Sequence, residues 1–257
     1  MAHLAVRDLH LSFGGLRALD GVTLEVQERD LFALVGPNGA GKTCILNVVS
    51  GVYRAQQGFV SFEGWDVGRL PPYQIAKLGI ARTFQGVELF KHMTVLENLL
   101  LGRHIHMRTG VLTGGLWWGP AHREEVEHRR RVEEVIDFLE LERYRKVLVV
   151  NLPFGVQKLV GVARALAMEP KMMLLDEPSS GMNRQEKEDL ARFLLRIKYD
   201  RGITMLWVEH DMQLVGDLAD RMAVLHYGRK IAEGEPREVT SNPEVIQAYL
   251  GEPEPVR

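Results

Sequence analysis

Apolar and polar residues alternate along two segments near the N-terminus of the chain. The segments "LAVRDLHLSF" (4–13) and "LDGVTLEVQERD" (19–30) show the two-residue period of strands that are buried on one face. Gly14 and Gly15 lie between them, and glycine pairs favour tight turns. The pattern predicts an N-terminal antiparallel sheet.

Short apolar runs without alternation occur further along the chain. They are "LFALV" (31–35), "KMMLLDEP" (171–178) and "GITMLWVEH" (202–210), and each is typical of a strand covered on both faces. The first run leads through a glycine-rich turn into the apolar-periodic "TCILNVVSGV" (43–52), which predicts strand, loop and helix. We expect two late strands in "RMAVLHYGRKIAEG" (221–234), around a turn at Gly228. Together these runs predict an α/β sheet.

The segment "HREEVEHRRRVEEVIDFLELERY" (122–144) has roughly helical apolar spacing among dense charges, so we expect an amphipathic helix with a solvated charged face. The expected apolar positions are Val126, Val132, Val135, Ile136, Leu139 and Leu141. A glycine-rich insertion, "RTGVLTGGLWWGPA" (108–121), precedes it. Trp117 and Trp118 in this insertion favour packing anchors slightly over a docking site.

Composition narrows the class of protein. The 257 residues, 46% of them hydrophobic, suffice for a sizeable core, and 32 basic against 34 acidic residues give no sign of a nucleic-acid partner. The single cysteine, Cys44, rules out an internal disulfide and agrees with a reducing compartment. No apolar run approaches the roughly 18 residues needed to span a bilayer, and the N-terminus does not have the pattern of a signal peptide.

The turn after the first buried strand is the strongest chemical signal. "GPNGAGKT" (36–43) fits the pattern G-x-x-x-x-G-K-[ST] between a predicted strand and a predicted helix. Backbone N–H groups of such a loop surround phosphates, the lysine neutralises phosphate charge, and the threonine hydroxyl binds Mg²⁺. The expected nucleotide-binding residues are Gly36, Pro37, Asn38, Gly39, Ala40, Gly41, Lys42 and Thr43, and also Cys44, whose backbone N–H reaches phosphate while its thiol stays passive.

Charged side chains end the two later buried strands. Asp176 and Glu177 follow the strand in "MMLLDEP", at the carboxyl end where open α/β sheets bind ligands. We expect Asp176 near the Mg²⁺ shell and Glu177 as the general base that polarises an attacking water. His210, at the end of the next strand, is placed to hydrogen-bond the γ-phosphate. An acidic strand end or a lone histidine would mean little without the phosphate loop.

The segment "NLPFGVQKLVGVARAL" (151–166) reads as a helix whose first turn faces an anion, although Pro153 stands where a hydroxyl is expected. Proline is compatible with a helix entrance because the N–H that it lacks would be unpaired there. This segment therefore predicts a second anion-binding element.

These motifs, in this order, resemble those of an ABC transporter ATPase subunit over 4–251. "GPNGAGKT" looks like the Walker A loop, "MMLLDEP" the Walker B strand, "RTFQ" the Q-loop, "SSGMN" the D-loop and "VEHD" the H-loop. The resemblance implies a P-loop NTPase (RecA-like) core with an N-terminal antiparallel β subdomain and an inserted α-helical subdomain. The implied bounds are 1–93 and 165–235 for the core, 94–164 for the insertion and 236–257 for a C-terminal extension.

The resemblance also assigns roles residue by residue. It implies that Phe13 stacks on adenine, that Gln85 contacts Mg²⁺ and the attacking water, that Glu177 is the catalytic carboxylate and that His210 is the switch. The D-loop residues are Ser180, Gly181 and Asn183, and the expected magnesium ligands, direct or through water, are Thr43, Gln85 and Asp176.

The family's signature motif is altered in this chain. "LPFGVQK" stands where L-S-G-G-Q is usual, so that Pro153 replaces the serine and Val156 the glutamine. The signature residues Pro153, Phe154, Gly155, Val156 and Gln157 are expected to act on ATP held by a partner chain. Losing one hydroxyl contact to phosphate costs about 1.5–3 kcal/mol, and less where water substitutes. We hypothesise that a heterodimer would then have two unequal ATP sites.

Finer features are similar to the LivG-type branched-chain amino acid importer ATPases. They include "GIARTFQGVELFKHMTVLENLL", the glycine-rich insertion and the ending "NPEVIQAYLG"; the similar lipopolysaccharide-export ATPases generally lack the insertion. Importers of urea or short amides share these features and stay open as an alternative.

The resemblance implies ATP and Mg²⁺ as cofactors and a peripheral location on the cytoplasmic face of the plasma membrane. The implied partners are a second ATPase subunit in a homo- or heterodimeric sandwich, membrane permease subunits, and indirectly a substrate-binding protein. A soluble ABC-type ATPase acting on nucleic acid or ribosomes is less favoured, because the chain has no room for tandem ATPase domains or a long coiled coil. A binding-only domain would not need Lys42, Asp176, Glu177 and His210 together.

Overall fold

The computed structural model describes residues 2–83, 88–107 and 120–250. It divides into two compact units, which we describe separately. The first comprises Met1–Arg82, Lys171–Glu177 and Leu194–Arg257, and the second comprises Thr83–Pro170 and Pro178–Phe193. The described residues of 94–164, for which the sequence predicts an inserted subdomain, lie within the second unit, and residues 236–250 lie within the first; the predicted domain bounds stay a prediction.

An antiparallel sheet is formed by the N-terminal part of the first unit. Its strands are β1 (Leu4–Phe13), β2 (Leu16–Val26), β4 (Gln57–Phe62) and β5 (Trp65–Asp66), in the order β2-β1-β4-β5. β1 pairs with β2 from Leu4 opposite Val26 to Phe13 opposite Leu16. The predicted N-terminal antiparallel sheet is therefore confirmed. Alternation places Leu4 and Val6 in the interior, and an irregularity in the pairing between Val6 and Leu9 brings Leu9 to the interior as well.

The second sheet of this unit has six strands in the order β10-β9-β3-β8-β7-β6. They are β3 (Leu31–Val35), β6 (Ile80–Arg82), β7 (Met172–Asp176), β8 (Thr204–Val208), β9 (Arg221–His226) and β10 (Arg229–Gly234). The pairs from β6 to β9 are parallel, and β10 runs antiparallel to β9. Every residue of β3, β7 and β8 is buried, which confirms the strands predicted from the uninterrupted apolar runs.

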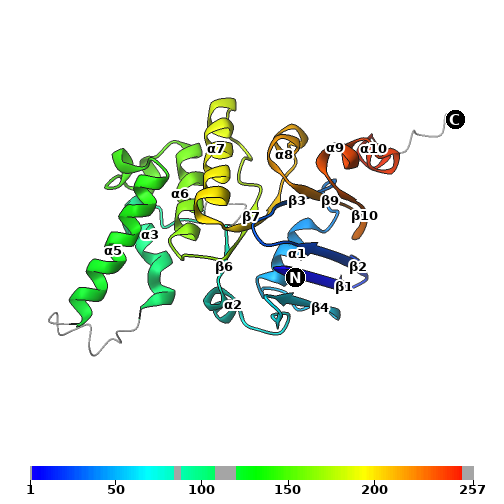
Figure 1. Cartoon of the computed structure of the whole chain (residues 1–257), viewed down its shortest axis with the longest axis horizontal. Helices are drawn as coiled ribbons and strands as arrows, with labels where there is room; N and C mark the ends of the chain where they lie inside the picture. Colours follow the sequence, from blue (N-terminus) through cyan, green and yellow to red (C-terminus); the bar gives the residue numbers. More distant parts are fainter. Residues whose placement is uncertain (1, 84–87, 108–119, 251–257) are drawn as a thin grey trace. The chain divides into compact units, whose positions relative to one another are not determined.

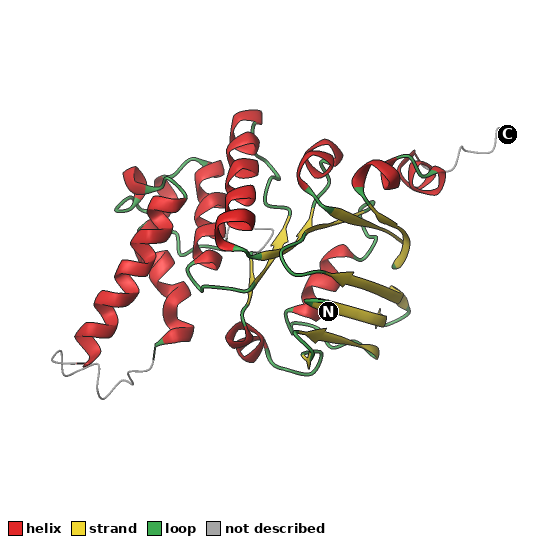
Figure 2. Ribbon diagram, viewed as in Figure 1, coloured by secondary structure: helices red, strands yellow, loops and turns green. Residues whose placement is uncertain are grey.

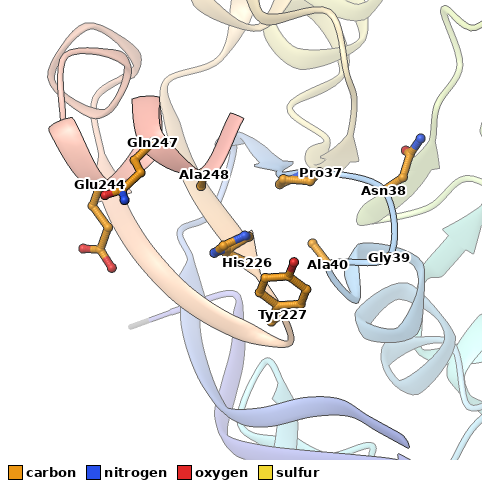
Figure 3. Close-up of a pocket in the computed structure, with 9 residues that line it drawn as sticks. All are labelled: Pro37, Asn38, Gly39, Ala40, His226, Tyr227, Glu244, Gln247 and Ala248. Carbon is orange, nitrogen blue, oxygen red and sulfur yellow. The ribbon is translucent and has the colours of Figure 1, made fainter. Parts of the chain in front are cut away.

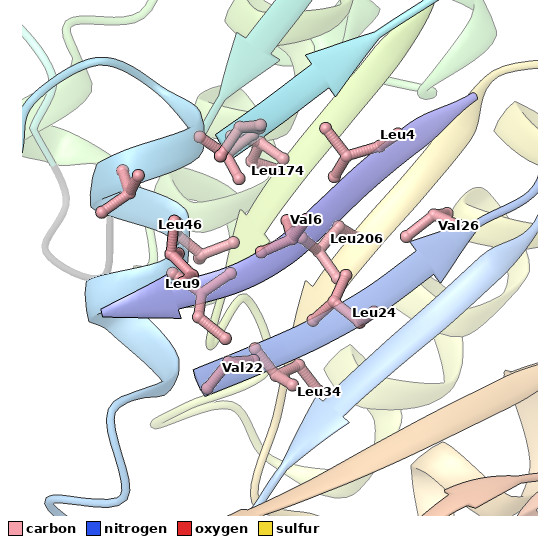
Figure 4. Packing of buried hydrophobic residues seen from close by; sticks show 14 of the residues in the cluster. Leu4, Val6, Leu9, Val22, Leu24, Val26, Leu34, Leu46, Leu174 and Leu206 are labelled. Atoms are coloured by element: carbon pink, nitrogen blue, oxygen red, sulfur yellow. The ribbon is translucent and has the colours of Figure 1, made fainter. Parts of the chain in front are cut away.

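The core of the first unit lies between its two sheets, around helix α1 (Lys42–Val49). Leu46 of α1 belongs to the same buried cluster as Leu9 of the antiparallel sheet and Leu174 and Leu206 of the parallel one, as Figure 4 shows. This packing fixes the start of α1 relative to the carboxyl ends of β3 and β7. The other helices of the unit are α2 (Pro72–Leu78), α8 (Met212–Leu218), α9 (Pro236–Thr240) and α10 (Pro243–Leu250) (Figure 1).

The second unit is helical (Figure 2). Its α-helices are α3 (Val95–Gly102), α5 (Pro120–Phe138), α6 (Phe154–Leu166) and the first part of α7 (Arg184–Arg201), with short 3₁₀ turns at Arg103–His106, Glu142–Tyr144 and Val149–Asn151. α3 packs against α5 and α6. Thr94 and Glu97 form a capping box, which explains why α3 begins where it does.

The predicted amphipathic helix exists as α5, with one correction near each end. Val132 and Ile136 are fully buried, as expected, but Val126 is 53% exposed. The helix ends at Phe138, six residues before the predicted segment does, so Leu139 and Leu141 lie in the turn that follows it, where both are buried. Trp117 and Trp118 lie outside the described residues. None of the helices in the described part of the chain is long and apolar enough to cross a membrane.

Candidate functional site

The loop between β3 and α1 has the backbone that phosphate binding requires. Gly36 has φ 145°, and a Cβ there would lie 2.1 Å from the carbonyl oxygen of Leu225, so only glycine fits. Gly41, in the left-handed conformation, is the N-cap of α1, and Lys42 begins the helix. The N–H groups of the first turn of α1 therefore lie at the end of this loop, where an anion binds favourably.

Lys42 is buried in the loop that it is expected to serve. Its Nζ donates hydrogen bonds to the carbonyl oxygens of Gly36 and Pro37, at 2.7 and 2.9 Å. Burial lowers the pKa of Lys42, and the carboxylates of Glu177 and Asp176 act in the opposite direction. The ammonium group is thus held inside its own loop and lies within the field of both acidic residues.

Asp176, the last residue of β7, is buried and ion-paired. Its Oδ2 accepts a hydrogen bond from Nη2 of Arg82 at 3.0 Å, and only 8% of the Arg82 side chain is exposed. Nη1 of Arg82 also donates to Oδ1 of Asn47 at 2.6 Å and to Oγ of Ser50 at 2.9 Å, both at the C-terminal end of α1. The sequence motifs indicated no role for Arg82, although a charged residue at the end of an apolar strand could have indicated a buried ion pair.

Glu177 and His210 form a direct contact. Nε2 of His210 lies 2.5 Å from Oε1 of Glu177. The tautomer of the imidazole decides which of the two atoms donates in this hydrogen bond. The backbone of Glu177 has φ 46°, and its N–H donates to the carbonyl oxygen of Val208 at 3.0 Å. Two residues predicted separately as base and switch are thus brought together.

The turn that carries His210 is fixed by its neighbours. Glu209 is buried, and its carboxylate accepts from Nε1 of Trp207 at 3.2 Å and from the backbone N–H of His210 at 2.9 Å. Asp211 caps α8 by accepting from the N–H of Leu214. Glu209 stands in the motif "VEHD", but its supporting role depends on contacts that no sequence pattern encodes.

The donors available for a divalent cation suit magnesium. Asp176 offers a carboxylate and Thr43, in the first turn of α1, a hydroxyl. Magnesium prefers such oxygen donors and completes its shell with phosphate and water, so one carboxylate and one hydroxyl are sufficient protein ligands. Gln85, the third expected ligand, lies outside the described residues.

Phe13, expected to stack on adenine, lies at the end of β1 with 45% of its surface exposed. Its ring meets that of Tyr53 edge-on, with centroids 5.1 Å apart. No pattern in the sequence connects these two aromatic residues. Cys44 is partly buried, and burial raises the pKa of its thiol, so the group stays protonated at neutral pH, as a passive side chain would.

The expected signature residues lie in the second unit, at the start of α6. Pro153 is the N-cap, and no side chain caps the helix there. Pro153 and Phe154 are exposed, whereas Gly155 is buried and Val156 and Gln157 are partly buried. The amide of Gln157 donates to the carbonyl oxygen of Leu152 at 2.8 Å, so this side chain is directed to its own loop.

The D-loop residues of the same unit contact the signature residues. Gly181 has φ 78°, and a Cβ there would lie 2.7 Å from the ring of Phe154. A Cβ on Gly155 would likewise meet the carboxylate of Glu186. Glu186 and Asn183 cap α7 by bonding each other's backbone N–H groups, at 2.9 and 3.0 Å, and Ser180 is exposed beside them. The start of α6 and the D-loop therefore form one packed cluster.

A cavity of about 600 Å³ opens on the outer side of the phosphate loop in the first unit. Figure 3 shows Pro37, Asn38, Gly39 and Ala40 on one side of it and α10 on the other, with His226 and Tyr227 between them. Glu244, Gln247 and Ala248 of α10 complete the lining. The sequence did not predict that the C-terminal helix lies beside this loop.

Comparisons with known proteins agree with this geometry. A family model described as "ABC transporter" matches residues 19–180, and one described as "Branched-chain amino acid ATP-binding cassette transporter" matches 229–255. The chain is 38% identical over 250 residues to the branched-chain amino acid transport ATP-binding protein BraF of Pseudomonas aeruginosa, covering 97% of this chain and 98% of BraF. It is 39% identical over 249 residues to LivG of Salmonella typhimurium, covering 97% and 98%.

Solved structures show the same fold. A nucleotide-free ATP-binding cassette from an ABC transporter superposes with a TM-score of 0.85 and 34% identity, covering 98% of this chain and 100% of that one. A cassette in its ADP conformation matches equally well, with 35% identity over 98% and 100%. A dimeric bacterial ABC transporter cassette matches with a TM-score of 0.77 and 25% identity over 91% and 99%. This chain therefore belongs to the ABC transporter family of ATP-binding cassettes.

Proposed function

We propose that this chain is the ATP-binding and hydrolysing subunit that powers an importer of branched-chain, hydrophobic amino acids. The observation that carries the proposal is the similarity to BraF and LivG over 97% of the chain. The separate match of 229–255 to the branched-chain model supports the same cargo class. A cassette acts on cargo through its partner subunits, so the cargo itself is inferred from these relatives.

In this proposal the first unit holds the nucleotide. The backbone N–H groups of 36–44 and the ammonium of Lys42 surround the phosphates, and the exposed ring of Phe13 stacks on adenine. Lys42 would exchange its present carbonyl partners, Gly36 and Pro37, for phosphate oxygens. That exchange is favourable because hydrogen bonds between charged groups are stronger than those to neutral acceptors.

Thr43, Asp176 and Gln85 are the proposed holders of Mg²⁺, directly or through water. The bound ion would neutralise phosphate charge and align the γ-phosphate. The chain's own part is to place one hydroxyl and one carboxylate on packed elements, the first turn of α1 and the end of β7.

Hydrolysis is assigned to the Glu177 and His210 pair. Glu177 would accept the proton of the attacking water, and His210 would hydrogen-bond the γ-phosphate. In the observed arrangement Oε1 of Glu177 and Nε2 of His210 bind each other at 2.5 Å, so these two atoms must exchange partners before they can act on nucleotide and water. We propose that the imidazole moves to phosphate when nucleotide binds and thereby releases Glu177.

A second ATPase subunit completes each site. We propose that Pro153, Phe154, Gly155, Val156 and Gln157 face the ATP of the partner, with Ser180, Gly181 and Asn183 at the same interface. The exposed Pro153 and Phe154 and the uncapped start of α6 support an anion-facing role in trans. Since Pro153 has no hydroxyl, a heterodimer would contain two unequal sites.

The remaining partners follow from the transporter class. The proposed assembly contains membrane permease subunits on the cytoplasmic face of the plasma membrane and, through them, a substrate-binding protein outside the membrane. Urea or short amides are the alternative cargo, because their importers share the features that point to LivG-type proteins.

Reconstitution tests the proposal. The chain would be assembled in lipid nanodiscs with a second ATPase, permeases and a binding protein from the same organism, and ATP hydrolysis would be measured with leucine, isoleucine, valine, urea or acetamide. We expect stimulation by the branched-chain amino acids alone. Stimulation by urea or acetamide instead would replace the cargo, and an assembly that hydrolyses no ATP with any cargo would contradict the energy-coupling role.

A further inference from the structure

Phe13 and Tyr53 form an exposed aromatic pair at the end of β1. Phe13 is the last residue of β1, with 45% of its surface exposed, and Tyr53, which follows α1, is 36% exposed. Their ring centroids lie 5.1 Å apart, and the ring planes make an angle of 69°. Such edge-on contacts are attractive, because the positive edge of one ring meets the negative face of the other. In either form of this contact, at least one face of the Phe13 ring stays free of Tyr53.

Tyr53 is tied to the helix that begins in the phosphate loop. The backbone N–H of Tyr53 donates to the carbonyl oxygen of Asn47 in α1 at 3.0 Å, and the N–H of Val52 donates to the same oxygen at 2.8 Å. The helix starts at Lys42 and lies in the core of the unit. One packed helix therefore connects the phosphate loop to the residue that contacts the Phe13 ring.

Gln56, in the same segment as Tyr53, fixes the backbone beside Phe13. Its Oε1 accepts from the N–H of Ser12 at 2.9 Å, and its Nε2 donates to the carbonyl oxygen of Ser12 at 2.9 Å. The backbone N–H of Gln56 also donates to the carbonyl oxygen of His10 at 3.0 Å. These bonds set the backbone of β1 near its end but do not restrict rotation of the Phe13 side chain, which the contact with Tyr53 does.

We propose that Tyr53 is a positioning residue for the base of the nucleotide, and that it acts by holding the Phe13 ring in the orientation that stacks on adenine. The inference rests on the proposed adenine-binding role of Phe13. An exposed ring without this contact would sample several rotamers, and binding would have to immobilise it at a cost in conformational entropy. Held by Tyr53, the Phe13 ring is already ordered when the base arrives. Loss of the Tyr53 ring should therefore weaken only ligands that carry a base.

The experiment compares two ligands that share their phosphates but differ in the base. ATP and inorganic tripolyphosphate would be titrated calorimetrically into the full chain, Tyr53→Leu and Tyr53→Phe, in the same magnesium buffer. We expect Tyr53→Leu to weaken ATP binding by about three- to tenfold and to leave tripolyphosphate binding unchanged. Tyr53→Phe keeps the ring and should restore most of the ATP affinity. Tyr73→Leu is the matched control, because Tyr73 is an exposed tyrosine of the same unit, on α2, and its loss should change neither affinity.

A double variant separates this mechanism from a direct contact between Tyr53 and the nucleotide. Phe13→Leu should lower the affinity for ATP and leave the affinity for tripolyphosphate unchanged. In that background Tyr53→Leu should cause no further loss, because Tyr53 acts through Phe13. Thermal melts of all variants show whether each is folded.

The possible results are distinct. Native ATP affinity in Tyr53→Leu, an equal loss for ATP and tripolyphosphate, or an equal loss from Tyr53→Leu with and without Phe13 would each overturn the proposal. Equal losses in Tyr53→Phe and Tyr53→Leu would assign the effect to the hydroxyl and would also contradict it. If Phe13→Leu itself binds ATP with native affinity, the proposed adenine role of Phe13 fails, and the role of Tyr53 fails with it.

Discussion

The two units prepare their ligand-facing groups in different ways. In the first, Lys42, Asp176, Glu177 and His210 are already bonded to other protein groups, and Asp176 is almost fully buried. In the second, the start of α6 carries exposed Pro153 and Phe154 and no side-chain cap. Side chains of the first unit must therefore exchange existing hydrogen bonds for bonds to the ligand. The start of α6 has no side-chain cap to displace, so an anion can bind there at the cost of few existing bonds.

This contrast indicates that the first unit is the part whose geometry the reaction depends on most strongly. Exchanging buried charge partners makes the outcome depend on geometry, because a misplaced group is left buried and unpaired. An exposed helix start attracts anions in general and tolerates changes at one position, since water substitutes for a missing contact. Substitutions in the first unit should accordingly have much larger effects than those at the start of α6.

The largest effect is expected at Glu177. Glu177→Gln removes the group that accepts a proton but keeps its size and a hydrogen bond to His210, so ATP binding should persist while turnover falls by about a thousandfold. Steady-state hydrolysis and ATP binding by the assembled transporter measure the two effects. Glu188→Gln, at an exposed site bonded to Arg184, is the control and should change neither. Native turnover in Glu177→Gln would remove Glu177 from the role of base.

The next largest effect is expected at Gly36. In Gly36→Ala the new Cβ would lie 2.1 Å from the carbonyl oxygen of Leu225, so the loop must move. We expect ATP affinity to fall by about a hundredfold, because several phosphate-binding N–H groups shift together. Calorimetric titration with ATP gives the value. Gly216→Ala, where the added methyl group meets open space, should bind normally; equal affinities in both variants would show that the loop is more tolerant than its packing indicates.

A moderate effect is expected at Pro153, the position that defines the contrast between the units. Pro153→Ser restores a hydroxyl at the N-cap of α6 and should raise ATP affinity at the partner's site by about two- to tenfold, because water offsets part of the missing contact. Nucleotide affinity and ATPase rate of the assembled transporter are the measurements. If both stay at their native values, the idea of two unequal sites fails.

The smallest effect is expected inside α6. A methyl group added at Gly161 meets no heavy atom within 4 Å, so Gly161→Ala should stabilise the helix by about 0.5–1 kcal/mol through backbone entropy. Thermal unfolding should show a small rise in melting temperature with ATP affinity unchanged. A change in ATP affinity would mean that helix stability and anion recognition in the second unit are coupled.

The sequence predicted best those elements in which every side chain has the same surroundings, such as a strand that is buried throughout. β3, β7 and β8 are buried at every position, so runs of four or five apolar residues sufficed to predict them. The phosphate loop was equally clear, because its spacing reflects backbone geometry and phosphate chemistry that recur wherever the motif occurs. The bonds of Lys42 to its own loop could not be predicted, since the pattern describes the loaded site.

Elements defined by distant contacts were missed. β6 has only three residues and ends in Arg82. It is defined by its pairing with β7, about 90 residues later in the chain, and by the bond of Arg82 to Asn47 of α1, which precedes it. β4, β5 and α2 are short and gave no strong period. Val126 fitted the helical spacing of α5 but is exposed, because periodicity locates a face without showing how far along the helix that face is covered.

Gly36 and Gly181 differ in whether a substitution at a neighbouring position could make room for a side chain. Gly36 is confined by a backbone oxygen of Leu225, which every amino acid at that position would present, so no second substitution there can relieve a side chain at 36. Gly181 is confined by the ring of Phe154, which a smaller residue would remove, and also by its φ of 78°, which only glycine adopts readily and asparagine tolerates. In related sequences we expect position 36 to stay invariant, while position 181 changes only to asparagine and together with a smaller residue at position 154. We therefore expect the sequence of the phosphate loop to be conserved among related subunits, and the sequence at the start of α6 to diverge.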